Sequence, residues 1–197
     1  MSLSHKQPPP PAAIVIFGAN GDLTKRLIVP ALYNLSRSGL LPPRLALVGV
    51  DHNHKSTEEW RDALKAFLSD VLAKNSERVD EKLWQPIAQK MRFFQGDFTD
   101  DGAYRKLAEE LNKLDREHAL GGNILFYMAV ADRFFATIAA KLGKAGLAKE
   151  EGPASNKGFR RLIVEKPFGH DLASARALNE CLLEFFSEEQ IYRIDHF

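Results

Sequence analysis

The chain has 197 residues, of which 45% are hydrophobic and 27% are charged, so it can build one domain with a buried core and is not a disordered chain. Its 27 lysine and arginine residues nearly balance its 26 aspartate and glutamate residues, which argues against nucleic acid or an anionic membrane as the main partner. The single cysteine, Cys181, cannot form an internal disulfide, and its helical surroundings favour a packed side chain over a nucleophile.

Residues 1–13 read MSLSHKQPPPPAA, and we expect them to form a disordered leader. The four consecutive prolines favour an extended polyproline conformation and donate no backbone hydrogen bonds. The segment lacks the apolar stretch of a secretory signal, and no later apolar run approaches the ~18 residues that span a bilayer. We therefore predict a cytoplasmic protein without a membrane partner, whose domain covers residues 14–197.

From residue 14 onward, short runs rich in β-branched and aromatic residues alternate with longer amphipathic stretches. The predicted strands are 14–17, 45–50, 91–98, 123–130, 161–165 and 191–194. Strands that alternate with helices form right-handed crossover units and build a parallel sheet. The pattern therefore predicts an α/β fold with a six-stranded, mostly parallel, doubly wound sheet and helices on both faces.

Amphipathic periodicity predicts helices between these strands. The first helix should kink at Pro30, which cannot donate a helical hydrogen bond. Ser56 and Glu59 form a capping box at the start of the second helix. The stretch 100–119 carries apolar residues at helical spacing between charges, and Asp171 is placed to cap the last helix.

The first predicted strand ends in Gly-Ala-Asn-Gly-Asp, residues 18–22, and an amphipathic stretch begins at once. Such a turn in a parallel sheet gathers backbone N–H groups at the positive end of a helix dipole, which suits an anion. Glycine at positions 18 and 21 would let a diphosphate approach the amides closely. The spacing matches neither G-x-G-x-x-G, since Asn20 and Leu23 replace its later glycines, nor a P-loop, so a purely structural turn remains an alternative.

Polar residues close or follow four other predicted strands, at the edge where open α/β sheets bind ligands. They are Asp51-His52-Asn53-His54, Asp97, Glu165-Lys166-Pro167 and Asp195-His196. Asp97 could cap the next helix or accept a hydrogen bond from an adenine amino group. His52 and His54 have no third ligand at a suitable spacing, so we expect no metal site.

Three motifs make the chain resemble the N-terminal, coenzyme-binding part of the glucose-6-phosphate dehydrogenase family. GANGDLTKR at 18–26 is similar to the family's Gly-Ala-Ser-Gly-Asp-Leu-Ala/Thr-Lys turn, and EKPFGHDL at 165–172 to its Glu-Lys-Pro-Phe-Gly stretch. RIDHF at 193–197 resembles the start of its Arg-Ile-Asp-His-Tyr-Leu-Gly-Lys segment. The resemblance implies a Rossmann-like domain and oxidation of D-glucose 6-phosphate to 6-phospho-D-glucono-1,5-lactone, with hydride transfer to NADP or NAD, in the pentose phosphate pathway.

The resemblance also implies roles for individual residues. The residues that would hold the coenzyme diphosphate are Gly18, Ala19, Asn20, Gly21, Asp22, Leu23, Thr24 and Lys25. Lys166 would reach both sugar and coenzyme and would precede a cis-proline. His196 would contact the sugar phosphate, and Asp195 would orient a catalytic histidine.

In the family, that histidine lies beyond the position of residue 197. A phosphate-binding lysine and the second domain, through which the family dimerises, also lie further on. We therefore expect this chain to be a truncated fragment of a homo-oligomeric enzyme, which binds a nucleotide weakly and does not turn over.

Coenzyme choice is left open by the residues after the second strand. The family usually has an arginine there that meets the 2′-phosphate of NADP, and this chain has Asp51 followed by His52 at the arginine's position. The carboxylate favours the ribose hydroxyls of NAD, whereas Lys55 or a protonated His52 could compensate for it. NADP is the family's default, and NAD or dual use is an equal alternative. The family also often has a Pro-Pro pair where this chain has Ala131-Asp132, and usually a tyrosine where it has Phe197.

Other functions compete with this interpretation. A short-chain dehydrogenase needs Tyr-x-x-x-Lys, and no tyrosine of this chain has a lysine at that spacing. A non-catalytic NAD(P)-binding regulatory module fits the same residues. A protein–protein scaffold with an incidental glycine turn would not respond to nucleotides.

Overall fold

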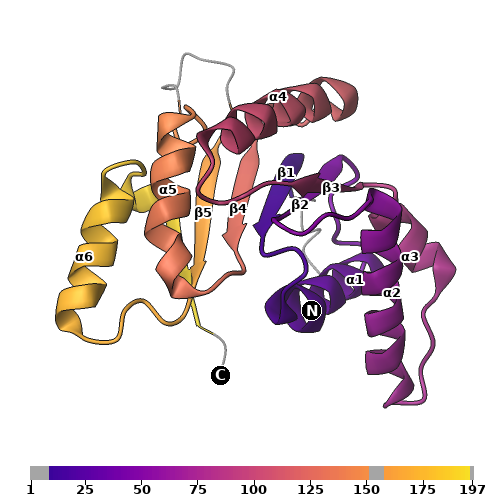
Figure 1. Cartoon of the computed structure of the whole chain (residues 1–197). Helices are drawn as coiled ribbons and strands as arrows, with labels where there is room; N and C mark the ends of the chain where they lie inside the picture. Colours follow the sequence, from indigo (N-terminus) through magenta and orange to yellow (C-terminus); the bar gives the residue numbers. More distant parts are fainter. Residues whose placement is uncertain (1–8, 151–157, 196–197) are drawn as a thin grey trace, which may run out of the picture.

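The computed structural model describes residues 9–150 and 158–195, which form a sheet covered by helices on both faces (Figure 1). The strands are β1 (Ala12–Phe17), β2 (Leu45–Asp51), β3 (Met91–Gln95), β4 (Ile124–Met128), β5 (Arg160–Glu165) and β6 (Ile191–Ile194). They lie in the order β3-β2-β1-β4-β5-β6, and every neighbouring pair is parallel. This order confirms the predicted Rossmann-like, doubly wound fold, in which the strand order reverses at β1 and opens a crevice at the carboxyl ends.

Three strand boundaries differ from the prediction by two or more residues. β1 begins at Ala12, so the boundary of the predicted leader at residue 13 is wrong: Ala12 and Ala13 pair with β2, and Ala13 is only 2% exposed. The rest of the leader lies mostly in residues 1–8, outside the described part of the chain. β3 and β4 end at Gln95 and Met128, before their apolar runs end, because the residues that follow line a cavity instead of extending the sheet.

The helices are α1 (Val29–Arg37), α2 (Thr57–Ala73), α3 (Glu81–Ala88), α4 (Asp101–His118), α5 (Phe135–Lys144) and α6 (Leu172–Leu183). A π-helical turn (Thr24–Ile28) leads into α1, and two 3₁₀ turns (Asp132–Phe134 and Glu188–Gln190) precede α5 and β6. Pro30 is the second residue of α1 and follows this π-helical turn directly, and the kink at Pro30 stays a prediction. None of the helices in the described part of the chain is both long enough and apolar enough to cross a membrane.

Local capping explains where two of these helices begin. Glu59 N donates to Ser56 Oγ at 3.1 Å, and Ser56 N donates to the Glu59 carboxylate at 2.7 Å, so the predicted capping box is present at α2. Asp171 accepts from Ser174 N at 2.7 Å and starts α6 as predicted. These bonds satisfy amides that have no acceptor within the helix.

Two hydrophobic cores lie on opposite faces of the sheet, and alternate residues of β1 serve both. Val15 and Phe17 belong to the core under α4, α5 and α6, whereas Ile16 belongs to the core under α1, α2 and α3. The two groups of helices lie on either side of the strands (Figure 1). Because β1 is buried on both faces, its sequence is continuously apolar, and its carboxyl end is held firmly where the site begins.

Candidate functional site

A cavity of about 810 Å³ lies at the carboxyl ends of β1 to β5. The turn after β1 and the loops after β2, β3, β4 and β5 all contribute to its lining. The predicted site residues found in the lining are Gly18, Gly21, Asp22, Leu23, Asp51, His52, Asp97 and Lys166. The fold therefore brings together residues that are up to 148 positions apart, at the point where a doubly wound sheet forms its ligand crevice.

The turn after β1 uses the amides of its first four residues for its own hydrogen bonds. The bonds are Gly18 N to Val50 O (3.0 Å), Ala19 N to Val50 O (3.2 Å), Asn20 N to Asp51 Oδ2 (3.0 Å) and Gly21 N to Gly18 O (2.9 Å). The expectation that Gly18 and Gly21 present their own amides to a diphosphate is therefore wrong. These amides are directed into the protein because they tie the turn to the end of β2.

Glycine is required at position 18 by packing. Its φ is +86°, and a Cβ placed there would lie 2.2 Å from the carbonyl oxygen of Ala129, at the end of β4. At Gly21 a Cβ would lie 3.1 Å from Gly18 O, so this position is also tight. The two glycines let the turn pack against β4, and this packing brings the start of the next helix to the cavity.

The anion-binding capacity of this corner lies in that helix start. Asp22 and Leu23 line the cavity, and Lys25 N already donates back to Gly21 O at 3.3 Å. Amides in a first helical turn have no acceptor within the helix, and the positive end of the helix dipole lies beside them. The Asp22 carboxylate is paired with Arg26 Nε at 2.8 Å. The backbone after Gly21 therefore suits a phosphate better than the glycines themselves.

Other residues of the predicted diphosphate turn have mainly structural contacts. Ala19 is buried, and its carbonyl accepts from Trp60 Nε1 at 3.0 Å. Thr24 is buried and donates from Oγ1 to Gly18 O at 2.9 Å. The side-chain oxygen and nitrogen of Asn20 are buried, and neither has a hydrogen-bond partner among the described residues. A buried amide of this kind costs about 1–3 kcal/mol if it stays unpaired, so it fits a turn completed by a ligand or by water.

Asp51 braces the turn at the end of β2. Asp51 is 6% exposed, and its carboxylate accepts from Asn20 N at 3.0 Å and from both Asn53 N and Asn53 Nδ2 at 3.2 Å. His52 Nδ1 lies 3.3 Å from the same carboxylate. Much of the hydrogen-bonding capacity of Asp51 is thus used within the protein, whereas the His52 side chain is 70% exposed at the edge of the cavity.

Asp97 does not cap α4. Asp100 is the cap, since it accepts from Gly102 N at 2.9 Å and from Ala103 N at 3.1 Å. Asp97 accepts from Thr99 N and Thr99 Oγ1, both at 2.7 Å, and these bonds lower the pKa of the Asp97 carboxyl. A charged acceptor therefore faces the cavity after β3, and the contact with an adenine amino group stays a prediction.

Lys166 follows β5 and lines the cavity. Its Nζ lies 2.7 Å from Asp195 Oδ2. Asp195, which was predicted to orient a histidine, therefore forms an ion pair with Lys166, which was predicted to bind the sugar. The Lys166–Pro167 peptide bond is cis, as the resemblance implied. His196, the predicted ligand of the sugar phosphate, lies outside the described residues.

A buried pair lies next to Lys166. The Tyr127 hydroxyl of β4 donates to Glu165 Oε1, and Glu165 is 4% exposed. Burial and this bond to a carboxylate raise the pKa of Tyr127, so the hydroxyl keeps its proton and remains a donor. The pair links the ends of β4 and β5 and holds the start of the loop that carries Lys166. Sequence reasoning noted Glu165 but gave it no role, because the contact with Tyr127 depends on strand order.

The loop after β4 supplies lining residues that the sequence interpretation missed. Arg133 and Phe134 line the cavity beside Phe98, and the two phenylalanine rings meet edge to face with centroids 5.6 Å apart. The signal that could have identified these two residues is their position in a loop after a central strand, the same rule that selected the other four segments. The described residues contain no group of three His, Cys, Asp or Glu side chains that could bind a metal.

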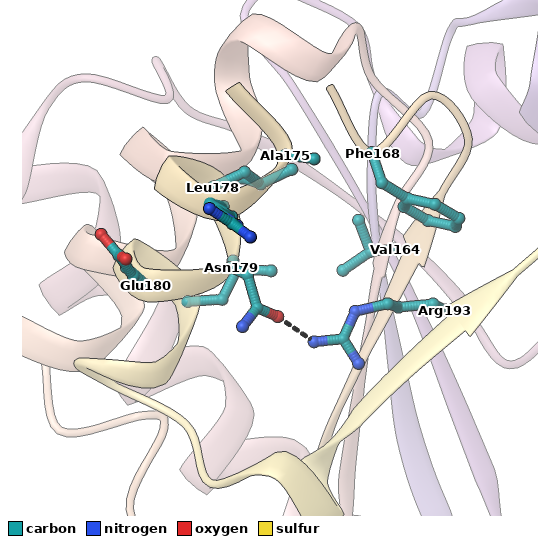
Figure 2. Close-up of a pocket in the computed structure, with 9 residues that line it drawn as sticks. Val164, Phe168, Ala175, Leu178, Asn179, Glu180 and Arg193 are labelled. Atoms are coloured by element: carbon teal, nitrogen blue, oxygen red, sulfur yellow. Dashed lines mark hydrogen bonds between the residues drawn. The ribbon is translucent and has the colours of Figure 1, made fainter. Parts of the chain in front are cut away.

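A second cavity, of about 340 Å³, lies between α6 and the strands β5 and β6 (Figure 2). Val164, Phe168 and Leu178 give it an apolar surface. Arg176 and Arg193 also line it. The Arg193 guanidinium donates to Asn179 Oδ1 (Figure 2) and to Glu188 Oε1, the latter at 2.6 Å. This cavity therefore offers a ligand apolar contact and two arginines, of which Arg193 already has partners, and the glycine turn does not line it.

Comparison with known proteins agrees with the observed fold. Residues 15–197 match the family model described as "Glucose-6-phosphate dehydrogenase, NAD binding domain". The chain is 40% identical to "Glucose-6-phosphate 1-dehydrogenase 2" of Mycobacterium tuberculosis (strain ATCC 25618 / H37Rv), over 95% of this chain and 35% of the relative. It is also 40% identical to "Glucose-6-phosphate 1-dehydrogenase" of Bacillus subtilis (strain 168), over 95% of this chain and 36% of the relative.

Solved structures give the same result. A structure described as "Glucose-6-phosphate dehydrogenase in complex with its substrate glucose-6-phosphate" superposes with a TM-score of 0.82 at 33% identity and covers 97% of this chain and 37% of that one. The enzyme from Mycobacterium avium superposes with a TM-score of 0.77 at 32% identity, over 95% of this chain and 37% of that one. The chain thus spans little more than a third of the length of these relatives.

Proposed function

Because the chain belongs to the glucose-6-phosphate dehydrogenase family and represents its NAD-binding domain, we propose that the 810 Å³ cavity holds a nicotinamide dinucleotide across the carboxyl ends of the strands. The diphosphate lies over the first helical turn after Gly21, and the adenosine lies toward β2 and β3. The observation that carries this proposal is the meeting of the β1 turn, Asp51, Asp97 and Lys166 around one cavity at the reversal of strand order.

For the whole protein, we propose oxidation of D-glucose 6-phosphate at C1 to the 1,5-lactone. The nicotinamide, when bound, accepts the hydride. Lys166 contacts the sugar and the coenzyme, and Asp195 holds its ammonium at 2.7 Å. The Tyr127–Glu165 pair fixes the strand end that carries Lys166. A His196 contact with the sugar phosphate and the role of Asp195 in orienting a base histidine remain parts of this proposal.

The coenzyme is proposed to be NADP, with NAD as a second substrate of similar affinity. Asp51 already accepts hydrogen bonds from Asn20 and Asn53, which leaves less capacity for the ribose hydroxyls of NAD. His52 is the exposed side chain beside it and can meet a 2′-phosphate, although a neutral imidazole attracts that group less than an arginine does.

A calorimetric titration of the 197-residue chain with NADP and with NAD tests the proposal. We expect saturable 1:1 binding of both, and no turnover when glucose 6-phosphate is added, because the chain spans little more than a third of its enzyme relatives. Absence of any heat of binding would favour a scaffold. Binding without turnover in the whole protein would favour a regulatory module.

The homo-oligomeric state and the cytoplasmic location predicted from the sequence also belong to this proposal. Native mass measurement tests the oligomeric state, and cell fractionation tests the location.

A further inference from the structure

The amides of Gly18 and Gly21 are bonded within the protein, which raises the question of what balances the charge of a bound diphosphate. A diphosphate carries two negative charges, and the cavity also presents carboxylates. Asp22, Asp51 and Asp97 all line it. The first-turn amides supply only part of the compensation, so a cationic side chain should lie in the same cavity.

Among the described residues that line the cavity, the basic side chains are His52, Arg133 and Lys166. Lys166 is paired with Asp195, and His52 lies beside Asp51. Arg133 forms no ion pair with any described residue. The neighbouring carboxylate of Asp132 is engaged elsewhere: it accepts from the Arg133 backbone N–H at 2.9 Å and lies 3.1 Å from His170 Nε2.

The Arg133 guanidinium has a defined position despite its exposure. Its Cζ lies over the Phe134 ring, 4.7 Å from the centroid, and Phe134 in turn packs edge to face against Phe98. A guanidinium stacked on an aromatic ring keeps its N–H groups free in the plane, where they can bind a phosphate with two parallel hydrogen bonds. The aromatic contact reduces the side-chain entropy that such binding would cost.

We propose that Arg133 binds the diphosphate of the coenzyme and is a determinant of dinucleotide affinity in this domain. The inference rests on the proposed function, since it takes the dinucleotide to occupy this cavity. Arg133 follows β4, directly beside β1 in the sheet, and the Ala129 carbonyl at the end of β4 packs against Gly18. The guanidinium therefore lies on the nicotinamide side of the turn, opposite the side where His52 can meet the adenosine.

Calorimetry on Arg133→Gln, with NAD, NADP and ADP as probes, tests this assignment. We expect all three to bind about 10-fold or more weakly, because all three contain the diphosphate and a charge-assisted hydrogen bond is lost. Adenosine should bind unchanged. Arg105→Gln, an exposed arginine of α4 that does not line the cavity, is the matched control and should leave every affinity unchanged.

Two further variants separate charge from packing. Dinucleotide affinity should be highest in Arg133→Lys, lower in Arg133→Gln and lowest in Arg133→Glu. Added salt should reduce the affinity of Arg133→Gln less steeply than it reduces the affinity of the parent chain. A loss of stability alone would not lower the affinities in this order, and thermal melting measures the stability of each variant. If the parent binds the dinucleotides and Arg133→Gln binds them equally well, the assignment is wrong. It is also wrong if only glucose 6-phosphate binding changes, because the phosphate would then be that of the sugar. If the parent binds no dinucleotide, the proposed function fails instead.

Discussion

Gly18→Ala is the substitution that most directly probes how the turn is built. An alanine at φ +86° costs about 1–2 kcal/mol in backbone strain. Its Cβ would also lie 2.2 Å from Ala129 O, roughly 1 Å inside ordinary contact, so β1 and β4 must separate or the turn must shift. Overpacking of this kind costs about 1–3 kcal/mol, and we expect a total loss of about 2–5 kcal/mol in the free energy of unfolding.

Gly39→Ala is the matched control for this substitution. Gly39 also has a positive φ, +66°, but a Cβ there would meet no atom within 4 Å. It should lose only the strain of about 1–2 kcal/mol. Urea unfolding followed by circular dichroism measures both variants. If Gly18→Ala loses no more stability than Gly39→Ala, the turn does not pack against the end of β4, and the reasoning about this corner is refuted.

Three further substitutions test the rest of the site. Asp51→Ala should lower the free energy of unfolding by about 1–3 kcal/mol, because the partly buried Asn20 amide of the turn loses its acceptor. An unchanged urea midpoint would contradict the bracing role of Asp51. His52→Arg should raise NADP affinity about 10-fold and leave NAD affinity within about 2-fold, because only NADP carries a 2′-phosphate. Calorimetry measures both affinities, and equal changes for the two coenzymes would place the 2′-phosphate elsewhere. Tyr127→Phe should lower stability by about 1.5–3 kcal/mol, because the buried Glu165 carboxylate loses a donor, whereas the exposed Tyr192→Phe should have no effect in the same thermal melts.

The fold followed from the sequence because local signals agreed with the global pattern. The buried strands read as continuous apolar runs, and the capping residues Ser56 and Asp171 marked the helix starts where the structure has them. Two helices, α3 and α5, went unpredicted. Pro86 interrupts the helical pattern of α3. The loop before α5 contains apolar residues, so part of it was predicted to belong to the preceding strand.

The site was predictable in its position but not in its contacts. The rule that ligands bind at the carboxyl ends of parallel strands selected Asp51, Asp97 and Lys166, which line one cavity in the structure. The role of the glycines was misassigned because sequence does not show that Val50 O already accepts from Gly18 N and Ala19 N. Contacts between strands that are distant in sequence have no local signal, so the Tyr127–Glu165 bond was equally hidden.

A crystal structure of the 197-residue chain grown with NADP tests the central claim most directly. The account predicts the diphosphate within hydrogen-bonding distance of the Asp22 or Leu23 amides and of the Arg133 guanidinium, with the adenosine beside His52. A dinucleotide bound on another surface, or an empty cavity at saturating NADP, would contradict it.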